Sequence, residues 1–164
     1  MKRHYSAFLS RLSLASLVLL LACSKIKTGA SLSASDINHI KTLGILNNEE
    51  KIILFETHAG LFNSIETSGS YFTDQRIASY WIDNRDKSKT TINTAYYSEI
   101  DTITTLDLSQ DLTAASYLAI KKKNGQTFNV FISPSQEETT LFFNKAIALW
   151  QQHKRKSPSG ATYR

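Results

Sequence analysis

The chain has 164 residues, which is room for one domain with short extensions. Its 19 Lys and Arg against 14 Asp and Glu give a formal net charge of +5, and three of the basic residues (Lys2, Arg3 and Arg11) fall in an N-terminal leader, so +5 less these three leaves +2. So small a charge predicts no electrostatically driven nucleic-acid binding. A single Cys excludes a disulfide within the chain.

The first 22 residues have the layout of a secretory signal. A basic start precedes an apolar run over residues 12–22, and the small residue Ala22 stands directly before Cys23. The run is far shorter than the roughly 20 apolar residues that cross a membrane as a helix. We therefore expect residues 1–22 to be a cleaved signal peptide. A plain signal with an incidental cysteine, or a short uncleaved anchor, are the alternatives.

The four residues Leu20-Leu21-Ala22-Cys23 resemble the lipobox of bacterial lipoproteins. The resemblance implies lipid attachment at Cys23: the thiol is diacylated, the leader is removed, and the new amino group is acylated with a palmitate-like chain. Each buried methylene contributes about 0.8 kcal/mol, so two or three chains anchor a protein where one alone does not. Ser24 follows the cysteine. In a host with two membranes this implies the outer membrane, facing the periplasm, although the choice between inner and outer membrane stays open.

Beyond the cysteine, residues 23–35 are small and polar and are expected to form a flexible tether. A domain is expected over residues 36–153. It begins with a short helix over 37–43, with Asp36 as its N-cap and Gly44 after its end. Residues 154–164 are expected to be a disordered basic tail.

About seven short strands are expected next, because runs of β-branched and aromatic residues alternate with turn residues. Asp74-Gln75 is expected to form a tight turn, and Asn124-Gly125 a two-residue type I′ hairpin turn. The expected strands span residues 52–55, 69–73, 76–83, 90–97, 100–108, 117–123 and 127–133.

The domain ends in an amphipathic helix. Two capping boxes fit its start, Ser135 with Glu138 and Ser133 with Gln136, so its first residue stays open. Its apolar stripe consists of Phe142, Phe143, Ala146, Ile147, Leu149 and Trp150. A curled antiparallel sheet must close or cover its open end. The expected fold is therefore mainly β with α: a curled antiparallel sheet or open barrel of about seven strands, capped by one C-terminal helix.

Three segments, LNNEEKIILF at 46–55, TDQRI at 73–77 and YSEIDTI at 97–103, followed by the hairpin and the helix, resemble the bacterial pleckstrin-homology-like domains. The resemblance spans residues 44–153 and implies a fold, not an activity. Eukaryotic relatives often bind phosphoinositide headgroups through Lys and Arg in the loop after the first strand. The loop at 58–68 here has neither, so anion binding is not expected. Thr73 and Asp74 are expected to serve the turn, with Asp74 capping backbone amides.

No group of residues has a catalytic, cofactor-binding or metal-binding signature, so neither a cofactor nor a metal is expected. The histidines His39, His58 and His153 lack metal-ligand spacing. His58 with Glu56 and Asp74 is an imaginable acid–base set, but no nucleophile or oxyanion hole accompanies it. The run Lys121-Lys122-Lys123 is typical of a solvated hairpin end.

Aromatic residues are numerous for a small sheet. Tyr80-Trp81 and Tyr96-Tyr97 are adjacent pairs, so one ring of each must face the opposite side of its strand, and outward rings that cluster would form a partner surface. We therefore expect a non-enzymatic cell-envelope lipoprotein, tethered to the membrane through Cys23, that acts as a protein-binding or scaffold module. Strand addition to an open sheet edge is one mode of binding. The alternatives are a barrel that binds an apolar ligand, or a small envelope hydrolase that uses His58 and nearby acids.

Overall fold

The computed structural model describes residues 26–57, 64–111, 114–132 and 135–156. The predicted signal peptide, the lipobox with Cys23, and His58 lie outside the described residues. Within the described part of the chain, no helix has both the length and the apolar character needed to span a membrane.

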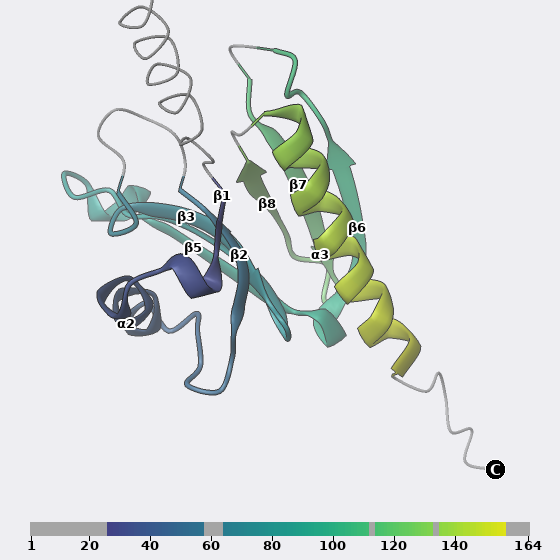
Figure 1. Cartoon of the computed structure of the whole chain (residues 1–164), viewed down its shortest axis with the longest axis horizontal. Coiled ribbons are helices and arrows are strands. Elements are labelled where there is room, and N and C mark those ends of the chain that lie inside the picture. The colour runs from purple at the N-terminus through teal and green to yellow at the C-terminus, as the bar shows by residue number, and fades with distance from the viewer. Residues whose placement is uncertain (1–25, 58–63, 112–113, 133–134, 157–164) are drawn as a thin grey trace, which may run out of the picture.

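Eight strands form two separate antiparallel sheets (Figure 1). The first sheet has the order β1-β2-β3-β4-β5, with β1 (Ile26–Thr28), β2 (Ile52–Glu56), β3 (Ser68–Thr73), β4 (Arg76–Trp81) and β5 (Thr91–Tyr96). The second has the order β6-β7-β8, with β6 (Ile100–Leu106), β7 (Ser116–Lys122) and β8 (Thr127–Ile132). Helix α3 (Gln136–Lys156) lies along the second sheet. The predicted mainly β fold with a C-terminal capping helix is confirmed, with one strand more than expected.

The additional strand is β1, and it corrects the predicted tether. β1 pairs antiparallel with β2, with Ile26 opposite Glu56, and a 3₁₀ turn η1 (Gly29–Ser31) follows it. Gly29 lies so close to β2 that a Cβ added there would be 1.8 Å from the Ile52 carbonyl oxygen. Ile26 and Leu32 are each only 9% exposed. Residues 26–35 are therefore part of the fold, because these two apolar side chains are buried against it.

Helix α2 (Ala34–Thr42) exists as predicted, but its N-cap is Ser33 and not Asp36. The Ser33 hydroxyl accepts from the Asp36 amide at 3.1 Å, and the Asp36 carboxylate accepts from the Ser33 amide at 3.0 Å. This reciprocal capping box moves the start of the helix by one turn. Gly44 follows the helix with a φ of 74°, the left-handed conformation that glycine adopts without strain.

Both faces of the first sheet are covered over β2, β3 and β4, so neighbouring residues on these strands enter different clusters. One cluster fills the space between the two sheets and α3, and it includes Leu54, Phe72, Ile77, Leu118, Val130 and Phe142. The other lies on the α2 side of the sheet, and it includes Ile40, Phe55, Tyr71, Ala78 and Tyr80. The pairs Leu54-Phe55, Tyr71-Phe72 and Ile77-Ala78 each contribute one side chain to each cluster. This is why β2, β3 and β4 have continuous buried runs.

The predicted β7–β8 hairpin is confirmed, but the type I′ turn is wrong. A type I′ turn needs positive φ at both central residues, whereas among the described non-glycine residues, Asn124 included, none has a positive φ. Gly125 has a φ of 88°. Its amide donates to the Lys122 carbonyl at 2.9 Å, and the Lys122 amide donates to the Gln126 carbonyl at 2.8 Å. The loop therefore has three residues, with Gly125 in the left-handed position.

Helix α3 uses the Ser135–Glu138 capping box. The Glu138 amide donates to the Ser135 hydroxyl at 3.5 Å, and the Ser135 amide donates to the Glu138 carboxylate at 3.4 Å. The helix buries Phe142, Phe143 and Ala146, as predicted. It continues to Lys156, so residues 154–156 are helical and not part of a disordered tail. Basic side chains in the last turn interact favourably with the helix dipole, which accounts for the extension.

Candidate functional site

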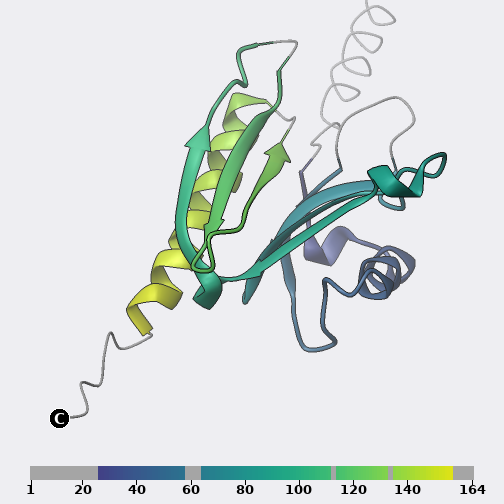
Figure 2. The same ribbon diagram turned by 180° about the vertical axis from the view of Figure 1, so that it is seen from behind.

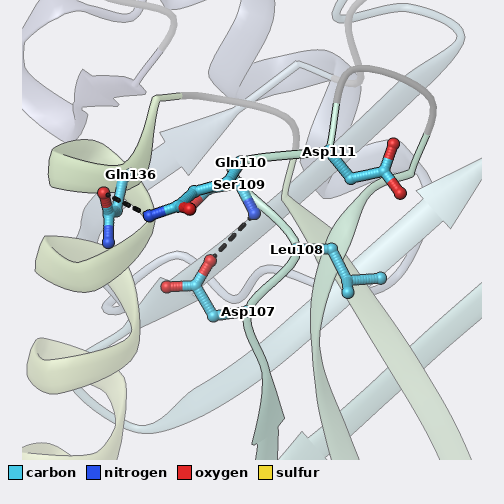
Figure 3. A pocket seen from close by; sticks show the side chains of 6 residues that line it. All are labelled: Asp107, Leu108, Ser109, Gln110, Asp111 and Gln136. Atoms are coloured by element: carbon cyan, nitrogen blue, oxygen red, sulfur yellow. Dashed lines mark hydrogen bonds between the residues drawn. The ribbon is translucent and has the colours of Figure 1, made fainter.

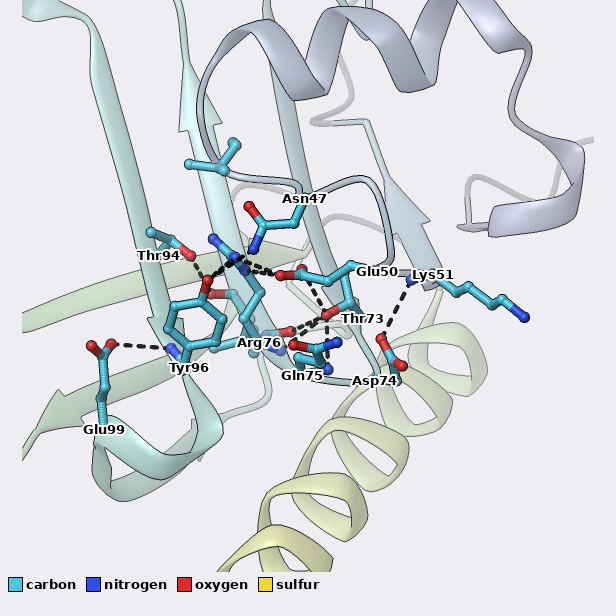
Figure 4. A network of polar contacts seen from close by, with 12 residues as sticks. Asn47, Glu50, Lys51, Thr73, Asp74, Gln75, Arg76, Thr94, Tyr96 and Glu99 are labelled. Atoms are coloured by element: carbon cyan, nitrogen blue, oxygen red, sulfur yellow. Dashed lines mark hydrogen bonds and ion pairs between the residues drawn. The ribbon is translucent and has the colours of Figure 1, made fainter.

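A buried ion pair lies at the start of the first sheet. Glu50 comes just before β2 and Arg76 begins β4, and their side chains are 0% and 3% exposed. Arg76 donates from Nε at 3.0 Å and from Nη2 at 2.5 Å, both to Glu50 Oε1 (Figure 4). The Thr73 hydroxyl donates to Glu50 Oε2 at 3.3 Å. Both carboxylate oxygens thus accept hydrogen bonds, which offsets the cost of burying the charge.

The ion pair extends into a polar network that reaches β5. Arg76 Nη2 also donates to the Tyr96 hydroxyl, and the guanidinium carbon lies 4.1 Å from the centroid of the Tyr96 ring. Asn47 Nδ2 donates to the same hydroxyl at 3.1 Å. The network therefore joins the segment before β2 to β4 and β5 (Figure 4). Its members satisfy one another, so we interpret it as a structural clamp.

The β3–β4 turn belongs to this clamp and corrects the role predicted for Asp74. The hydroxyl of Thr73, not the carboxylate of Asp74, caps the turn: it accepts from the amides of Gln75 and Arg76, both at 2.9 Å. Asp74 Oδ1 instead accepts from the Lys51 amide at 3.3 Å. The Asp74 carbonyl accepts from His153 Nε2 at 2.8 Å, which fixes the end of α3 against the turn. The Asp74 carboxylate therefore bonds to the segment before β2 and not to the amides of its own turn.

Three buried tyrosines anchor the chain to backbone carbonyls. Tyr71 donates to Ile45 at 2.7 Å, Tyr97 donates to Thr73 at 3.1 Å, and Tyr80 donates to Ile65. Burial disfavours the phenolate and raises the pKa of all three hydroxyls. These rings pack within the fold and are not catalytic candidates.

The structure does not bring the imagined acid–base set together. Glu56 is fully buried at the end of β2, opposite Ser70, whereas Asp74 follows Thr73, which lies opposite Ile52 at the other end of β2. Four residues of strand separate the two ends, about 13 Å at 3.3 Å per residue. His58, the third member, lies outside the described residues. Glu56 and Asp74 therefore cannot act on one reacting group.

The remaining histidines lie apart from each other. His39 is on α2 with its ring 6.4 Å from that of Tyr80, and His153 is near the end of α3 with its ring 5.0 Å from that of Tyr97. In the part of the chain that the structure describes, no three His, Cys, Asp or Glu side chains gather to hold a metal ion. The described residues thus offer no metal centre.

An open hollow of about 710 Å³ lies between the loop after β6 and the first turn of α3 (Figure 3). It is lined by Asp107, Leu108, Ser109, Gln110, Asp111 and Gln136. Asp107 Oδ1 accepts from the Ser109 amide at 2.9 Å and from the Ser116 hydroxyl at 3.3 Å, and hydrogen bonds from these two serines lower the pKa of Asp107. The Asp107 carboxylate is therefore engaged in organising its own loop.

An apolar row crosses the outer face of the second sheet. Leu106 lies opposite Tyr117, and Tyr117 lies opposite Phe131. Leu106 is 41% exposed and Phe131 is 40% exposed, and the Tyr117 and Phe131 rings meet edge to face at 5.5 Å. Their strand neighbours Leu118 and Val130 point to the opposite, buried face. Figure 2 shows the sheet from this side, with α3 behind it.

This outer row was not predicted, although the buried face on the other side of β8 was. The alternation of Phe128, Val130 and Ile132 places Phe131 on the opposite face, a signal already present in the sequence. Of the two aromatic pairs, Tyr80 and Tyr97 are buried while Trp81 and Tyr96 are more exposed. Trp81 lies opposite Thr91, and Tyr96 lies opposite Arg76, at the two ends of the β4–β5 pair. Their rings therefore do not form the cluster of outward aromatic rings that would have made a partner surface.

The interior between the sheets is occupied by side chains. Phe72, Leu118, Val130 and Phe142 are all 0% exposed, and the Phe72 and Phe142 rings meet edge to face at 4.8 Å. Helix α3 is thus packed into the sheet opening. A barrel that holds an apolar ligand needs interior space that these residues fill.

Comparison with known proteins yields one likeness in structure. The chain matches no protein-family model and no curated protein. It is similar to the crystal structure of a DUF1696 family protein with a pleckstrin-homology domain from Shewanella loihica PV-4, with a TM-score of 0.46 and 14% sequence identity. The match covers 73% of this chain and 93% of that chain. At this level of similarity, no residue role passes from that protein to this one.

Proposed function

We propose that this chain is a non-enzymatic protein-binding module of the cell envelope, held at a membrane by lipid at Cys23. The observation that carries the binding role is the outer row formed by Leu106, Tyr117 and Phe131. Exposed aromatic and large aliphatic side chains that adjoin one another are typical of protein interaction sites, because their burial against a partner is favourable. The row lies on the paired strands of a three-stranded sheet, where the backbone is already ordered before binding.

Two alternatives have less support. A barrel for an apolar ligand conflicts with the packed interior around Phe72 and Phe142. A hydrolase built on His58 conflicts with the separation of Glu56 from Asp74. The lipobox resemblance at residues 20–23 supports the membrane tether, and Ser24 supports an outer-membrane position facing the periplasm in a host with two membranes. The PH-like segments and the order of strands followed by one helix support a bacterial pleckstrin-homology-like domain.

The test compares two exposed apolar residues. Phe131→Ser removes the edge of the outer row, whereas Leu141→Ser changes a residue of 43% exposure on α3. We expect a specific partner to copurify with the wild-type protein and with Leu141→Ser from detergent-solubilised membranes, and to fall at least about fivefold with Phe131→Ser. Equal thermal midpoints of the two variants would exclude a folding defect. Equal partner recovery from both variants would contradict the role given to the outer row.

A further inference from the structure

A second hollow, of about 420 Å³, lies where the two sheets diverge. It is lined by Ile92, Asn93 and Thr94 of β5 and by residues of the β7–β8 hairpin, Lys122, Gln126, Thr127 and Phe128. β5 is the last strand of the first sheet, and β8 is the last strand of the second. Two strand edges therefore face one hollow.

The hydrogen bonds of β5 show which of its backbone groups point into the hollow. The Tyr97 amide donates to the Gln75 carbonyl, so the odd-numbered positions here bond toward β4. Lys122 Nζ donates to the Thr94 carbonyl at 3.3 Å from the hairpin side. Residues of an antiparallel strand alternate between its two edges, each presenting both its amide and its carbonyl to the same side. Ile92 and Thr94 therefore direct their backbone groups into the hollow.

The edge of β8 is partly covered. The Lys122 amide donates to the Gln126 carbonyl, so by the same alternation Thr127 and Asn129 face away from β7. The Asn129 carbonyl already accepts from the Ser79 hydroxyl of β4 at 3.3 Å. On β5 the carbonyl that is already bonded, that of Thr94, accepts from the long side chain of Lys122, which can move aside, whereas on β8 the Asn129 carbonyl is held by a strand of the other sheet. The edge that a further strand can reach is thus that of β5.

We propose that an extended segment of a partner protein adds to β5 in this hollow as a sixth strand of the first sheet. The inference rests on the proposed protein-binding function, but it uses a surface separate from the outer row. Alternating amides and carbonyls along an edge are matched by another strand, whose own backbone has the same spacing. The occupant is therefore defined first by its extended backbone.

The side chains around the edge specify the partner further. Phe128 is half-buried at the hollow and favours an apolar side chain on the inner side of the added strand. Ile92 is 43% exposed and provides an apolar contact on the other side. Lys122 holds the Thr94 carbonyl until an incoming amide replaces it, and its ammonium stays 3.4 Å from the Glu99 carboxylate. A lysine in this position also discourages indiscriminate edge pairing.

The first experiment needs no variant. The full-length protein in mild detergent is titrated with a seven-residue peptide of alternating valine and threonine, and with the same peptide N-methylated at alternate residues. We expect saturable NMR shifts at Ile92 and Thr94 with the first peptide, and at least about tenfold slower amide exchange at these two residues. N-methylation should abolish both effects. Equal effects of the two peptides, or shifts confined to Tyr117 and Phe131, would overturn the inference.

The second experiment uses a matched pair at one position. Thr94→Pro removes the amide that faces the hollow and keeps the backbone bonds of β5 to β4, and edge strands tolerate such a proline. It also removes the Thr94 hydroxyl, which donates to the Ile77 carbonyl of β4 at 3.5 Å, and Thr94→Val removes the same hydroxyl, so this loss is matched. Thr94→Val keeps that amide. We expect peptide affinity to fall at least about tenfold with Thr94→Pro and to stay within about twofold with Thr94→Val; if Thr94→Pro fails to fold, the exchange measurement decides. One pair of results separates the two proposals: Phe131→Ser loses the partner, while the peptide leaves amide exchange at Ile92 of the wild-type protein unchanged. These results would overturn the edge inference and leave the proposed function standing.

Discussion

Replacing Arg76 with methionine removes the cation from a carboxylate that is 0% exposed. Glu50 would keep its hydrogen bond from Thr73 but lose both bonds from the guanidinium. Removing one partner of a buried pair costs about 3–5 kcal/mol, because the other charge stays buried and unpaired. A domain of this size has a free energy of unfolding of about 5–15 kcal/mol. The substitution therefore removes a large part of the stability of the fold.

The assay is urea unfolding of the protein without its first 23 residues, followed by circular dichroism. With a slope of about 1–3 kcal/mol per molar urea, the midpoint should fall by roughly 1–5 M in Arg76→Met. Glu50→Gln should behave similarly, since it leaves the guanidinium buried without a counter-charge. Lys121→Met breaks the exposed contact to Asp101 at 3.9 Å and should leave the midpoint almost unchanged.

The double variant Glu50→Leu with Arg76→Met distinguishes a charge effect from simple loss of packing. Removing both charges leaves no unpaired ion, so the double variant should be more stable than either single variant. Two single effects that add without coupling would refute the account, because independent losses are expected only of residues that do not depend on each other.

Two further predictions concern the tyrosines and the anchor. Burial raises the pKa of Tyr71, Tyr80 and Tyr97. As the pH rises, these hydroxyls therefore lose their protons in the unfolded chain before they do so in the folded one. The free energy of unfolding should be constant below pH ~10 and decrease above it, by about 1.4 kcal/mol per pH unit for each ring. Urea midpoints between pH 8 and 11 measure this, and Tyr97→Phe should reduce the slope; a slope equal to that of the wild-type protein would count against it. Metabolic labelling with a palmitate analogue should mark the wild-type protein and not Cys23→Ala, and label that persists on the variant would remove the lipoprotein proposal.

Elements with a strong local pattern could be predicted from the sequence. The stripe from Phe142 to Trp150 and the β-branched runs of β5 and β6 each carry their own periodicity, so one segment sufficed to assign them. The three residues of β1 carry none. They form a strand only because they pair with the edge of β2, more than 20 residues later in the chain. The polar residues around them do not indicate this pairing. The turn at Asn124-Gly125 shows the limit of a dipeptide rule, since a third residue, Lys123, joins the loop.

The buried ion pair was hidden for a related reason. Glu50 stands in a run of polar residues that reads as an exposed turn, and Arg76 follows a tight turn where a charged side chain is ordinary. Only the β3–β4 hairpin, folded against the segment before β2, removes both side chains from water. The outer row was within reach of the sequence, because Phe131 falls between two positions assigned to the buried face. What the sequence lacked was the strand register, which places Leu106, Tyr117 and Phe131 side by side on that face.

The position of β1 bears on how a tethered domain could reach a partner. With Cys23 as the proposed anchor, Ile26 follows only three residues later, and consecutive Cα atoms are 3.8 Å apart, so the first strand starts within about 11 Å of the lipid-bearing residue. Under this proposal, the start of β1 is held near the bilayer. β5 lies at the opposite edge of the same sheet, four strand spacings or about 19 Å away. An edge held near the bilayer would be blocked to an incoming strand, whereas β5 stays accessible while the lipid remains inserted. The short anchor thus favours β5, rather than β1, as the edge that a partner uses.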